Sequence, residues 1–419
     1  MFIMAFTHIV QGMSASPVPQ PQETLPQMLK FTWSRAPNMP QGMQDNDGGV
    51  IGNWLILAGG FCGGYDDDWK PGKYPRGFLK KVWGLDLTNE EKGWIEFPDF
   101  PGIARQEMFG ISVNNAIYLW GGLSYTEPYA FDDGYKLSLT KSRESGPSQQ
   151  GDKWVWEELP KLPWRAAAGG ICAVESKIYI FGGHDYDLEN IYTLTDRTGT
   201  IKRFGACLLV FDTENPEVGW KELAQCPGTP RHQGGMAAVD GKIYVIGGAC
   251  HTAGPPAQHS VVDSWRYDPQ IGEWTRLRDL PVSCGGFSSG NIVYKNRYIL
   301  LACGYQHPTI LNPAGTMREK YGTPSQVVET WERHPRLKGG SKYFNHFWLY
   351  DAKTNLYGIA TKLPYDDHVP GTHVIKDTVY LFPGETGGFV YEGEYYGHHP
   401  EFVLKGKIEE LDWEKKIFC

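Results

Sequence analysis

The hexapeptide IYIFGG at residues 178–183 decides how this chain folds, because close copies of it recur along the whole sequence. Each copy is an apolar run typical of a buried strand, and each ends in two small residues, usually Gly-Gly. The other copies are LILAGG (55–60), IYLWGG (117–122), IYVIGG (243–248), ILLACG (299–304) and VYLFPG (379–384). Copies spaced roughly 60 residues apart indicate a repeat protein, although 419 residues alone would suggest two or three domains.

A second marker keeps the same period. Six aromatic residues are each followed seven positions later by proline, and a Gly-Gly strand ends 20 to 23 residues after each proline. The pairs are Trp33–Pro40, Trp94–Pro101, Trp156–Pro163, Trp220–Pro227, Trp274–Pro281 and Tyr357–Pro364. All units but the second also carry an aspartate after an apolar run, namely Asp86, Asp212, Asp268, Asp351 and Asp412. Each unit therefore predicts four antiparallel strands: one after the proline, one ending at Gly-Gly, one with the aspartate and one with the aromatic residue.

These units predict an all-β fold, a six-bladed β-propeller, because a four-stranded sheet cannot bury both of its faces alone. The last unit ends with its third strand near Leu411, whereas Trp33 has no third strand before it. We therefore expect the N-terminal segment Leu29–Asn38 to complete the last blade and close the ring. Residues 29–419 then form one propeller, and residues 1–28, rich in Pro and Gln, precede it as a tail.

The composition excludes several classes of function. A net charge of −8 argues against nucleic acid as a partner, and no apolar run is long enough to span a membrane. The apolar start has no Lys or Arg before Lys30, which favours a disordered tail over a signal peptide. The eight cysteines form no CxxC pair, which favours free thiols over disulfides. A cytoplasmic location is therefore preferred, with a periplasmic or secreted protein as the alternative, and the oligomeric state stays open.

A binding site is expected on one face of the ring. In a meander, the loops before each first strand and after each second strand lie on the same face, and the chain is elaborated there. Nearly 40 residues separate Tyr305 from Tyr343, and loops of that length are usually functional. Within this loop, Gln326–Arg336 is predicted as a short helix that would cover the mouth of the axis.

Polar residues beside these loops are the candidate binding and catalytic residues. Arg105, Arg165 and Arg231 favour an anionic or polyhydroxylated ligand, although such arginines can instead brace neighbouring blades. Glu385, between glycines in FPGETGG, would have its pKa raised by burial and could act as a base. The other candidates are Asp45, Asp47, Gln106 and Tyr305 for binding, Asp366 and Asp367 as a second carboxylate, and His184, His232 and His368 for proton transfer.

The adjacent histidines His398 and His399 resemble a metal-binding pair. Neighbouring side chains in a strand face opposite ways, however, and the sequence offers no evident third ligand. No metal is therefore predicted.

The Gly-Gly and Trp units resemble the kelch superfamily across residues 29–419. The copper ligands of galactose oxidase-like members cannot be assembled, and the Glu-x3-Asp-x3-His iron motif of plant specifier proteins does not occur. A narrower resemblance is to the bacterial sialic acid mutarotases, which are six-bladed kelch proteins. It is carried by GGFCGGYDDDWKPGKYPRGFLKKVWGLDL, by KYFNHFWLYDAKTN after the long excursion that follows GYQ, and by FPGETGG. The blade order is rotated, as in the cyclically permuted branch of that family.

This resemblance implies that the protein interconverts the α and β anomers of a sugar without a cofactor. Ring opening takes a proton from the anomeric hydroxyl and gives one to the ring oxygen. Glu385 falls on the family's catalytic glutamate and would be the base. Arg105, Arg165 or Arg231 would hold the substrate, and His184, His232 or His368 would donate the proton.

One position departs from the family pattern. The family has an arginine six residues after the catalytic glutamate, where this chain has Tyr391. The resemblance therefore carries over no contact for a substrate carboxylate and does not fix the sugar. The alternative function is a non-enzymatic kelch module that binds a protein or a glycan on its loop-rich face. A lyase or hydrolase would need a second carboxylate near Glu385.

Overall fold

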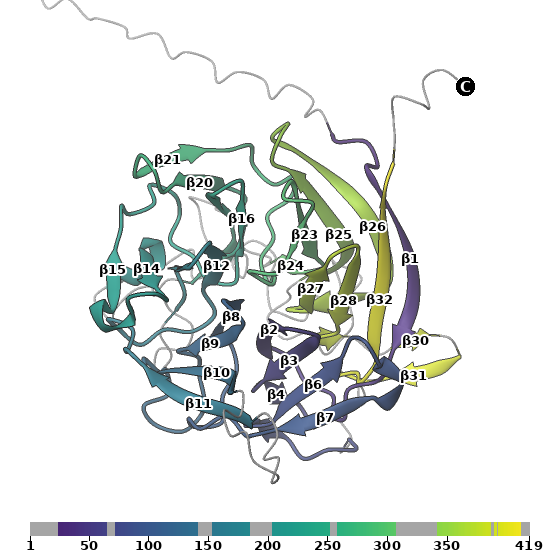
Figure 1. Cartoon of the computed structure of the whole chain (residues 1–419). Coiled ribbons are helices and arrows are strands. Elements are labelled where there is room, and N and C mark those ends of the chain that lie inside the picture. Colours follow the sequence, from purple (N-terminus) through teal and green to yellow (C-terminus); the bar gives the residue numbers. More distant parts are fainter. Residues whose placement is uncertain are drawn as a thin grey trace, which may run out of the picture.

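The computed structural model describes residues 24–64, 72–140, 153–184, 203–251, 258–306, 342–386, 389–391 and 393–411. Within these ranges the regular elements are strands, apart from three short 3₁₀ helices at Glu90–Lys92, Arg203–Ala206 and Pro216–Val218. Six antiparallel sheets surround a central axis, which confirms the predicted six-bladed propeller (Figure 1).

Each blade runs outward from an inner strand in chain order. The first three blades are β2 (Asp47–Ile51), β3 (Trp54–Ala58), β6 (Val82–Asp86) and β7 (Trp94–Phe97); β8 (Phe109–Val113), β9 (Ala116–Trp120), β10 (Gly134–Thr140) and β11 (Lys153–Leu159); and β12 (Gly170–Val174), β13 (Lys177–Phe181), β14 (Leu208–Asp212) and β15 (Trp220–Glu222). The last three are β16 (Gly235–Val239), β17 (Lys242–Ile246), β20 (Ser264–Asp268) and β21 (Glu273–Arg276); β22 (Val293–Tyr294), β23 (Tyr298–Ala302), β25 (Lys342–Asp351) and β26 (Leu356–His368); and β27 (Gly371–Ile375), β28 (Thr378–Phe382), β32 (Val403–Glu410) and β1 (Leu29–Ala36).

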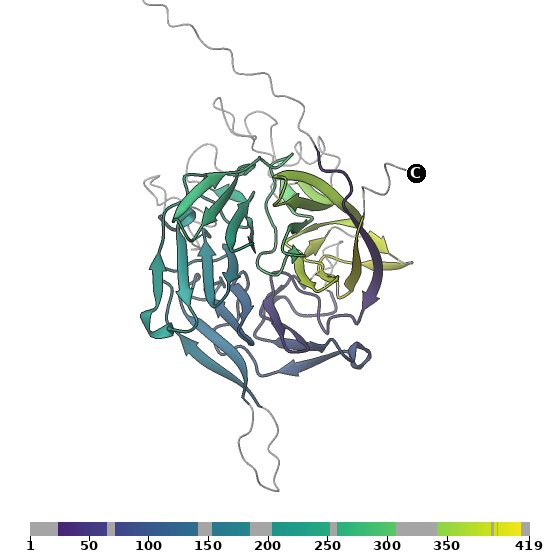
Figure 2. The ribbon, with the colours of Figure 1, turned by 45° about the horizontal axis from the view of Figure 1, so that its top comes forward.

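The ring closes through the N-terminal strand, as the sequence predicts. Strand β1 pairs antiparallel with β32, so that the first and last described strands lie side by side at the outer edge (Figures 1 and 2). Trp33 lies opposite Gly406 in this pairing. A Cβ on Gly406 would come within 2.7 Å of the indole, so this glycine makes room for the ring.

The outer-strand tryptophans have a structural reason for their regular spacing. Trp94 donates its indole N–H to the carbonyl of Pro37, Trp156 to that of Pro98, and Trp274 to that of Ala224, at 2.7–3.0 Å. In each case the acceptor lies four residues after the outer-strand tryptophan of the preceding blade. The repeated aromatic residue therefore joins adjacent blades, while its ring packs into their shared apolar layer.

The Gly-Gly pairs lie at the end of each second strand, where backbone segments approach each other closely. Gly59 and Gly60 both have positive φ angles, +69° and +104°. A Cβ on Gly60 would lie 2.7 Å from the carbonyl oxygen of Gln44, so only glycine fits this close approach.

The long connections 185–202 and 307–341 lie outside the described residues, so elaboration of a single face stays a prediction. The connection between the third and fourth strands of the second blade is also longer than a tight turn, because β10 ends at Thr140 and β11 begins at Lys153. Gln326–Arg336 lies outside the described residues. The seven described cysteines are buried free thiols, and no described helix is long and apolar enough to cross a membrane.

Candidate active site

Six backbone bridges build the mouth of the axis. In each blade, the residue directly after the two small residues pairs with a residue just before the blade's first strand. The bridges are Phe61–Gln44, Leu123–Gln106, His184–Ala167, Ala249–His232, Tyr305–Gly285 and Glu385–His368. Glu385 and His368 are thus the sixth blade's version of a repeated feature, and the fold places them opposite each other in antiparallel register.

One partner of each bridge lies before the first strand of its blade. The residues that directly follow these six partners form a ring across the blades. All six have positive φ angles between +49° and +77°: Asp45, Glu107, Ala168, Gln233, Gly286 and Val369. Backbone N–H groups join successive members, from Glu107 to Asp45, Ala168 to Glu107, Gln233 to Ala168, and Gly286 to Gln233, at 2.6–3.4 Å. This ring, called here the axial ring, forms the floor of the mouth.

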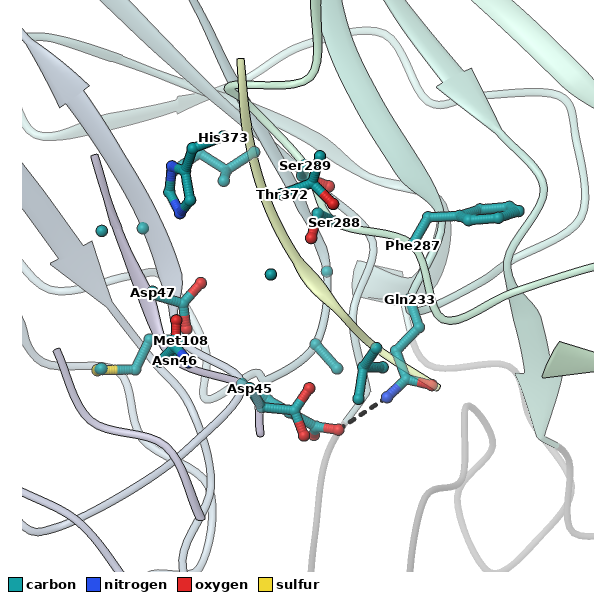
Figure 3. Close-up of a pocket in the computed structure, with 18 residues that line it drawn as sticks. Asp45, Asn46, Asp47, Met108, Gln233, Phe287, Ser288, Ser289, Thr372 and His373 are labelled. Atoms are coloured by element: carbon teal, nitrogen blue, oxygen red, sulfur yellow. Dashed lines mark hydrogen bonds between the residues drawn. The ribbon is translucent and has the colours of Figure 1, made fainter. Parts of the chain in front are cut away.

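A cavity of about 90 Å³ lies along the axis beside the axial ring. Figure 3 shows Asp45, Asp47, Gln233 and His373 around it, with Asp47 on β2 and His373 on β27. Burial, and then the nearby carboxylates, raise the pKa values of Asp45 and Asp47 well above the usual range. The cavity is therefore small and lined by carboxyl groups.

Glu385 on β29 (Glu385–Thr386) is surrounded by proton-bearing side chains. Tyr343 donates its hydroxyl to Oε1 at 3.1 Å, and His398 Nε2 lies 3.5 Å from the same oxygen. His368 Nδ1 lies 4.0 Å from Oε2, which is too long for a hydrogen bond. The side chains of Glu385, His398 and His368 are 26%, 19% and 19% exposed, so all three are within reach of a ligand.

The expectation that burial raises the pKa of Glu385 is wrong. Burial does act in that direction, but His368, His398 and His399 outweigh it and lower the pKa to about 2. The carboxylate is therefore ionised at neutral pH.

The expectation that His398 and His399 face opposite ways is also wrong. They follow β31 (Glu394–Tyr396) outside any strand, and their rings stack at 4.8 Å with an interplanar angle of 15°. Together with Glu385 they bring three potential ligand atoms within 4.8 Å of one another. His399 Nδ1, however, accepts the backbone N–H of Gly63 at 2.6 Å, so the neutral ring carries its proton on Nε2. This arrangement leaves two ligands and does not fit a metal site.

A cavity of about 300 Å³ borders the same histidines. Its other walls include Gly64, Lys73, Tyr74 and Glu401. Lys73 is paired with Glu401 at 3.0 Å, so its charge is already neutralised.

A second carboxylate–histidine pair lies deeper at the mouth. Glu107 contacts His184 Nε2 at 3.2 Å and accepts the amide N–H of Gln233 at 2.8 Å. Gln233 in turn accepts the hydroxyl of Tyr305 at 2.5 Å. Glu107 and His184 are only 5% and 0% exposed, and the His232 ring lies edge-on to His184 at 4.8 Å. His184 and His232 therefore belong to this buried chain and not to the surroundings of Glu385.

The structure corrects the prediction for two of the arginines. Arg105 is 1% exposed, donates to the carbonyl of Gly121 at 3.0 Å and forms an ion pair with Asp133 at 2.5 Å. Arg231 repeats the arrangement with the carbonyl of Gly247 and with Asp263. Each guanidinium group joins the segment that enters its own blade to the connection after that blade's second strand, so it neither braces a neighbouring blade nor is available to a ligand.

The remaining candidates lie in varied surroundings. Arg165 is exposed, Gln106 is buried and accepts the Gln44 amide at 3.4 Å, and Tyr305 lies edge-on to His368 at 4.5 Å. Asp366 is exposed. Asp367 is fully buried and accepts the backbone N–H groups of His368 and Gly384, so it is not a second catalytic carboxylate.

Sequence reasoning missed Glu107 and Tyr343 as site residues, and it considered His398 only as a metal ligand. Glu107 directly follows the candidates Arg105 and Gln106, and its place before a first strand could have identified it. Tyr343 and His398 are 42 and 13 residues from Glu385, and no spacing rule relates them to it.

Comparisons with known proteins agree with this architecture. The Kelch motif model matches residues 230–281, which span the fourth blade. A solved structure described as "Structure of YjhT" covers 90% of this chain and 100% of its own, with a TM-score of 0.57 and 14% identity, and thus supports the fold.

Two curated relatives cover most of the chain. N-acetylneuraminate epimerase from Pasteurella multocida (strain Pm70) is 23% identical over 381 residues, 84% of this chain and 88% of the relative. N-acetylneuraminate epimerase from Haemophilus influenzae (strain 86-028NP) is 41% identical over 379 residues, with the same shares covered. The chain therefore belongs to the N-acetylneuraminate epimerase family of kelch propellers.

Proposed function

We propose that this protein is a mutarotase that interconverts the anomers of sialic acid or a closely related sugar, with Glu385 as the base. The observation that carries the proposal is the partly exposed, ionised Glu385, which has side chains able to carry a proton beside both of its oxygens. Family membership supports the same reaction, because the relatives are named for the epimerisation of N-acetylneuraminate.

The reaction needs one proton acceptor and one proton donor. Glu385 takes the proton of the anomeric hydroxyl while His368 gives a proton to the ring oxygen. The bond between the anomeric carbon and the ring oxygen then breaks, and a carbonyl forms. After the carbonyl carbon rotates, the two groups return their protons in reverse and close the ring on the other face. A positioned acid–base pair contributes about 10²–10⁴-fold.

The local contacts suit these roles. The His368 side chain is 19% exposed, and among the described residues its Nδ1 atom has no hydrogen-bond partner, so a substrate atom that reaches the 4.0 Å contact with Glu385 can bond to both groups. Tyr343 holds one oxygen of Glu385 through its hydroxyl and stacks on the His368 ring at 5.2 Å. Tyr343 therefore positions both members of the pair.

An NMR anomerisation assay tests the proposal. Freshly dissolved single anomers of sialic acid, N-acetylmannosamine and common hexoses are followed with wild-type protein and with Glu385→Gln. We expect the wild type to accelerate the re-equilibration of sialic acid or a close relative, and the variant to lose this acceleration. If the wild type accelerates none of them, the protein is not a mutarotase of these sugars, and glycan binding without catalysis becomes the better account.

A further inference from the structure

The mouth presents a charge problem for an acidic sugar. Glu385 and Glu107 bring carboxyl groups to it, whereas Arg105 and Arg231 are engaged within their own blades. A sugar that carries a carboxylate needs a cation there to offset repulsion from the ionised Glu385. We infer that Arg76 is this cation: it binds the carboxylate of a sugar acid beside Glu385 and makes the protein prefer anionic sugars to neutral ones. This inference rests on the proposed mutarotase function.

Two consecutive glycines bring Arg76 next to the Glu385 cluster. A Cβ on Gly63 would lie 2.9 Å from Cε1 of His399 and 3.1 Å from Cδ2 of His398. A Cβ on Gly64 would lie 2.6 Å from the Cβ of Arg76. The glycine pair is therefore packed between the histidines that border Glu385 and the backbone of Arg76, with no room for larger side chains.

The guanidinium group of Arg76 lies on an aromatic platform that includes the mouth residue Phe61. Arg76 lies 5.0 Å from the ring centre of Phe61 and 6.0 Å from that of Tyr125, and Phe78 packs against both rings at 4.9 and 4.8 Å. Phe61 occupies the mouth position of the first blade that Glu385 occupies in the sixth. Phe61 also lies edge-on to His399 at 6.2 Å, which links the platform directly to the cluster.

Arg76 is available to a ligand. It is exposed, and among the described residues it forms no hydrogen bond or ion pair, whereas nearby Lys73 is neutralised by Glu401. A guanidinium group that stacks on an aromatic ring keeps its edge N–H groups free, and these match a carboxylate in bidentate fashion. Its charge also reaches the cluster: burial is the main cause of the low pKa of His399, about 3, and Arg76 adds to that effect.

The experiment compares a charged substrate with a neutral analogue that differs from it only at the carboxyl group. Anomerisation of sialic acid and of its methyl ester is measured with wild type, Arg76→Gln and Arg76→Lys. Loss of a charge-assisted contact predicts a KM for the acid about 10- to 100-fold higher in Arg76→Gln, with a smaller rise in Arg76→Lys. The ester should respond less than about twofold, because it has no carboxylate to lose that contact.

Arg276→Gln is the matched control. Arg276 is also exposed and lies 5.3 Å from the centre of the Trp265 ring, but it belongs to outer strand β21 of the fourth blade. We expect this variant to behave as wild type with both substrates. Circular dichroism of all variants separates a binding defect from unfolding, and Arg76→Lys keeps the charge should Arg76→Gln not fold.

The outcomes separate the two proposals. If the wild type accelerates neither substrate, the mutarotase function itself fails. If the wild type is active and Arg76→Gln changes the KM values for acid and ester equally, or changes neither, Arg76 does not read the carboxylate and the inference is overturned.

Discussion

Two carboxylate–histidine assemblies lie at the same mouth, and they differ in solvent access. Glu107 and His184 are 5% and 0% exposed, and the carboxylate is engaged by both His184 and Gln233. Glu385 and His368 are 26% and 19% exposed, and their closest atoms are 4.0 Å apart. The carboxylate of the first pair makes its hydrogen bonds within the protein, whereas Glu385 and His368 are too far apart to bond to each other and can each form a hydrogen bond to a ligand.

This difference indicates that burial and partner distance separate structural from chemical roles more sharply than residue type does. The Glu107 chain runs through Gln233 to Tyr305 and thus ties the second, fourth and fifth blades together below the mouth. Glu385 is held by Tyr343 at one oxygen, and its other oxygen faces the unpartnered Nδ1 of His368. A buried network that is fully satisfied makes the fold rigid, and an incompletely satisfied one at the surface can bind.

The largest effect should come from Glu385→Gln. The amide keeps the size of the side chain but cannot take a proton, so we expect kcat to fall by about 10²–10⁴-fold. The free energy of unfolding at pH 7 should change much less than the activity does. Steady-state anomerisation rates and urea unfolding of the same preparation check both statements, and an active Glu385→Gln variant would assign the base elsewhere.

The reverse pattern is expected for Glu107→Gln. Gln233 Nε2 and His184 Nε2 now each contact one carboxylate oxygen of Glu107. In the variant, the amide nitrogen of the new glutamine would replace one of these oxygens and would face one of the two nitrogens. A buried mismatch of this kind costs about 1–3 kcal/mol in the free energy of unfolding. Urea denaturation measures it.

Glu158→Gln on β11 is the control for that change, because Glu158 is exposed. It should leave the midpoint of unfolding nearly unchanged. If Glu107→Gln is as stable as this control, the buried pair is not structural, and the contrast between the two assemblies disappears.

The fold could be predicted from sequence because its determinants are local and repeated. The Gly-Gly strands and the outer-strand tryptophans each act within a blade or between neighbours, so every copy reports the same geometry. Ring closure also followed, because Trp33 could complete only a blade that lacked a fourth strand. Such features can be recognised from the spacing of residues along the chain alone.

The site was less predictable because its contacts depend on side-chain direction. Arg105 and Arg231 stand just before first strands, as expected, yet each turns into the blade to meet an aspartate that sequence reasoning had not paired with it. The direction of the pKa shift of Glu385 was also missed. It depends first on His368, and then on His398 and His399, which come near only through the excursion that includes the β30–β31 hairpin, where β30 is Phe389–Tyr391.

A smaller effect is expected for Tyr343→Phe. This change removes the hydroxyl that holds Glu385 Oε1 but keeps the ring that stacks on His368. Loss of one hydrogen bond of about 0.5–1.5 kcal/mol predicts roughly a 2- to 10-fold fall in kcat/KM. Tyr74→Phe, which removes a hydroxyl bonded to the carbonyl of Pro40, is the matched change and should leave kcat/KM unaltered.

The smallest effect concerns the acid limb of the pH profile, and it depends on the histidines that distinguish the Glu385 assembly. Because the pKa of Glu385 is lowered to about 2, the carboxylate stays ionised as the pH falls from 7 to 4, and its protonation should not limit the rate there. Replacing His398 with Asn removes one of the groups that lower this pKa. The pKa of Glu385 should then move up toward its ordinary value of 4.5, so the variant should lose activity at a higher pH than the wild type does. Rates for wild type and His398→Asn between pH 4 and 7 measure this displacement, and superimposable profiles would show that His398 does not control the ionisation of the base.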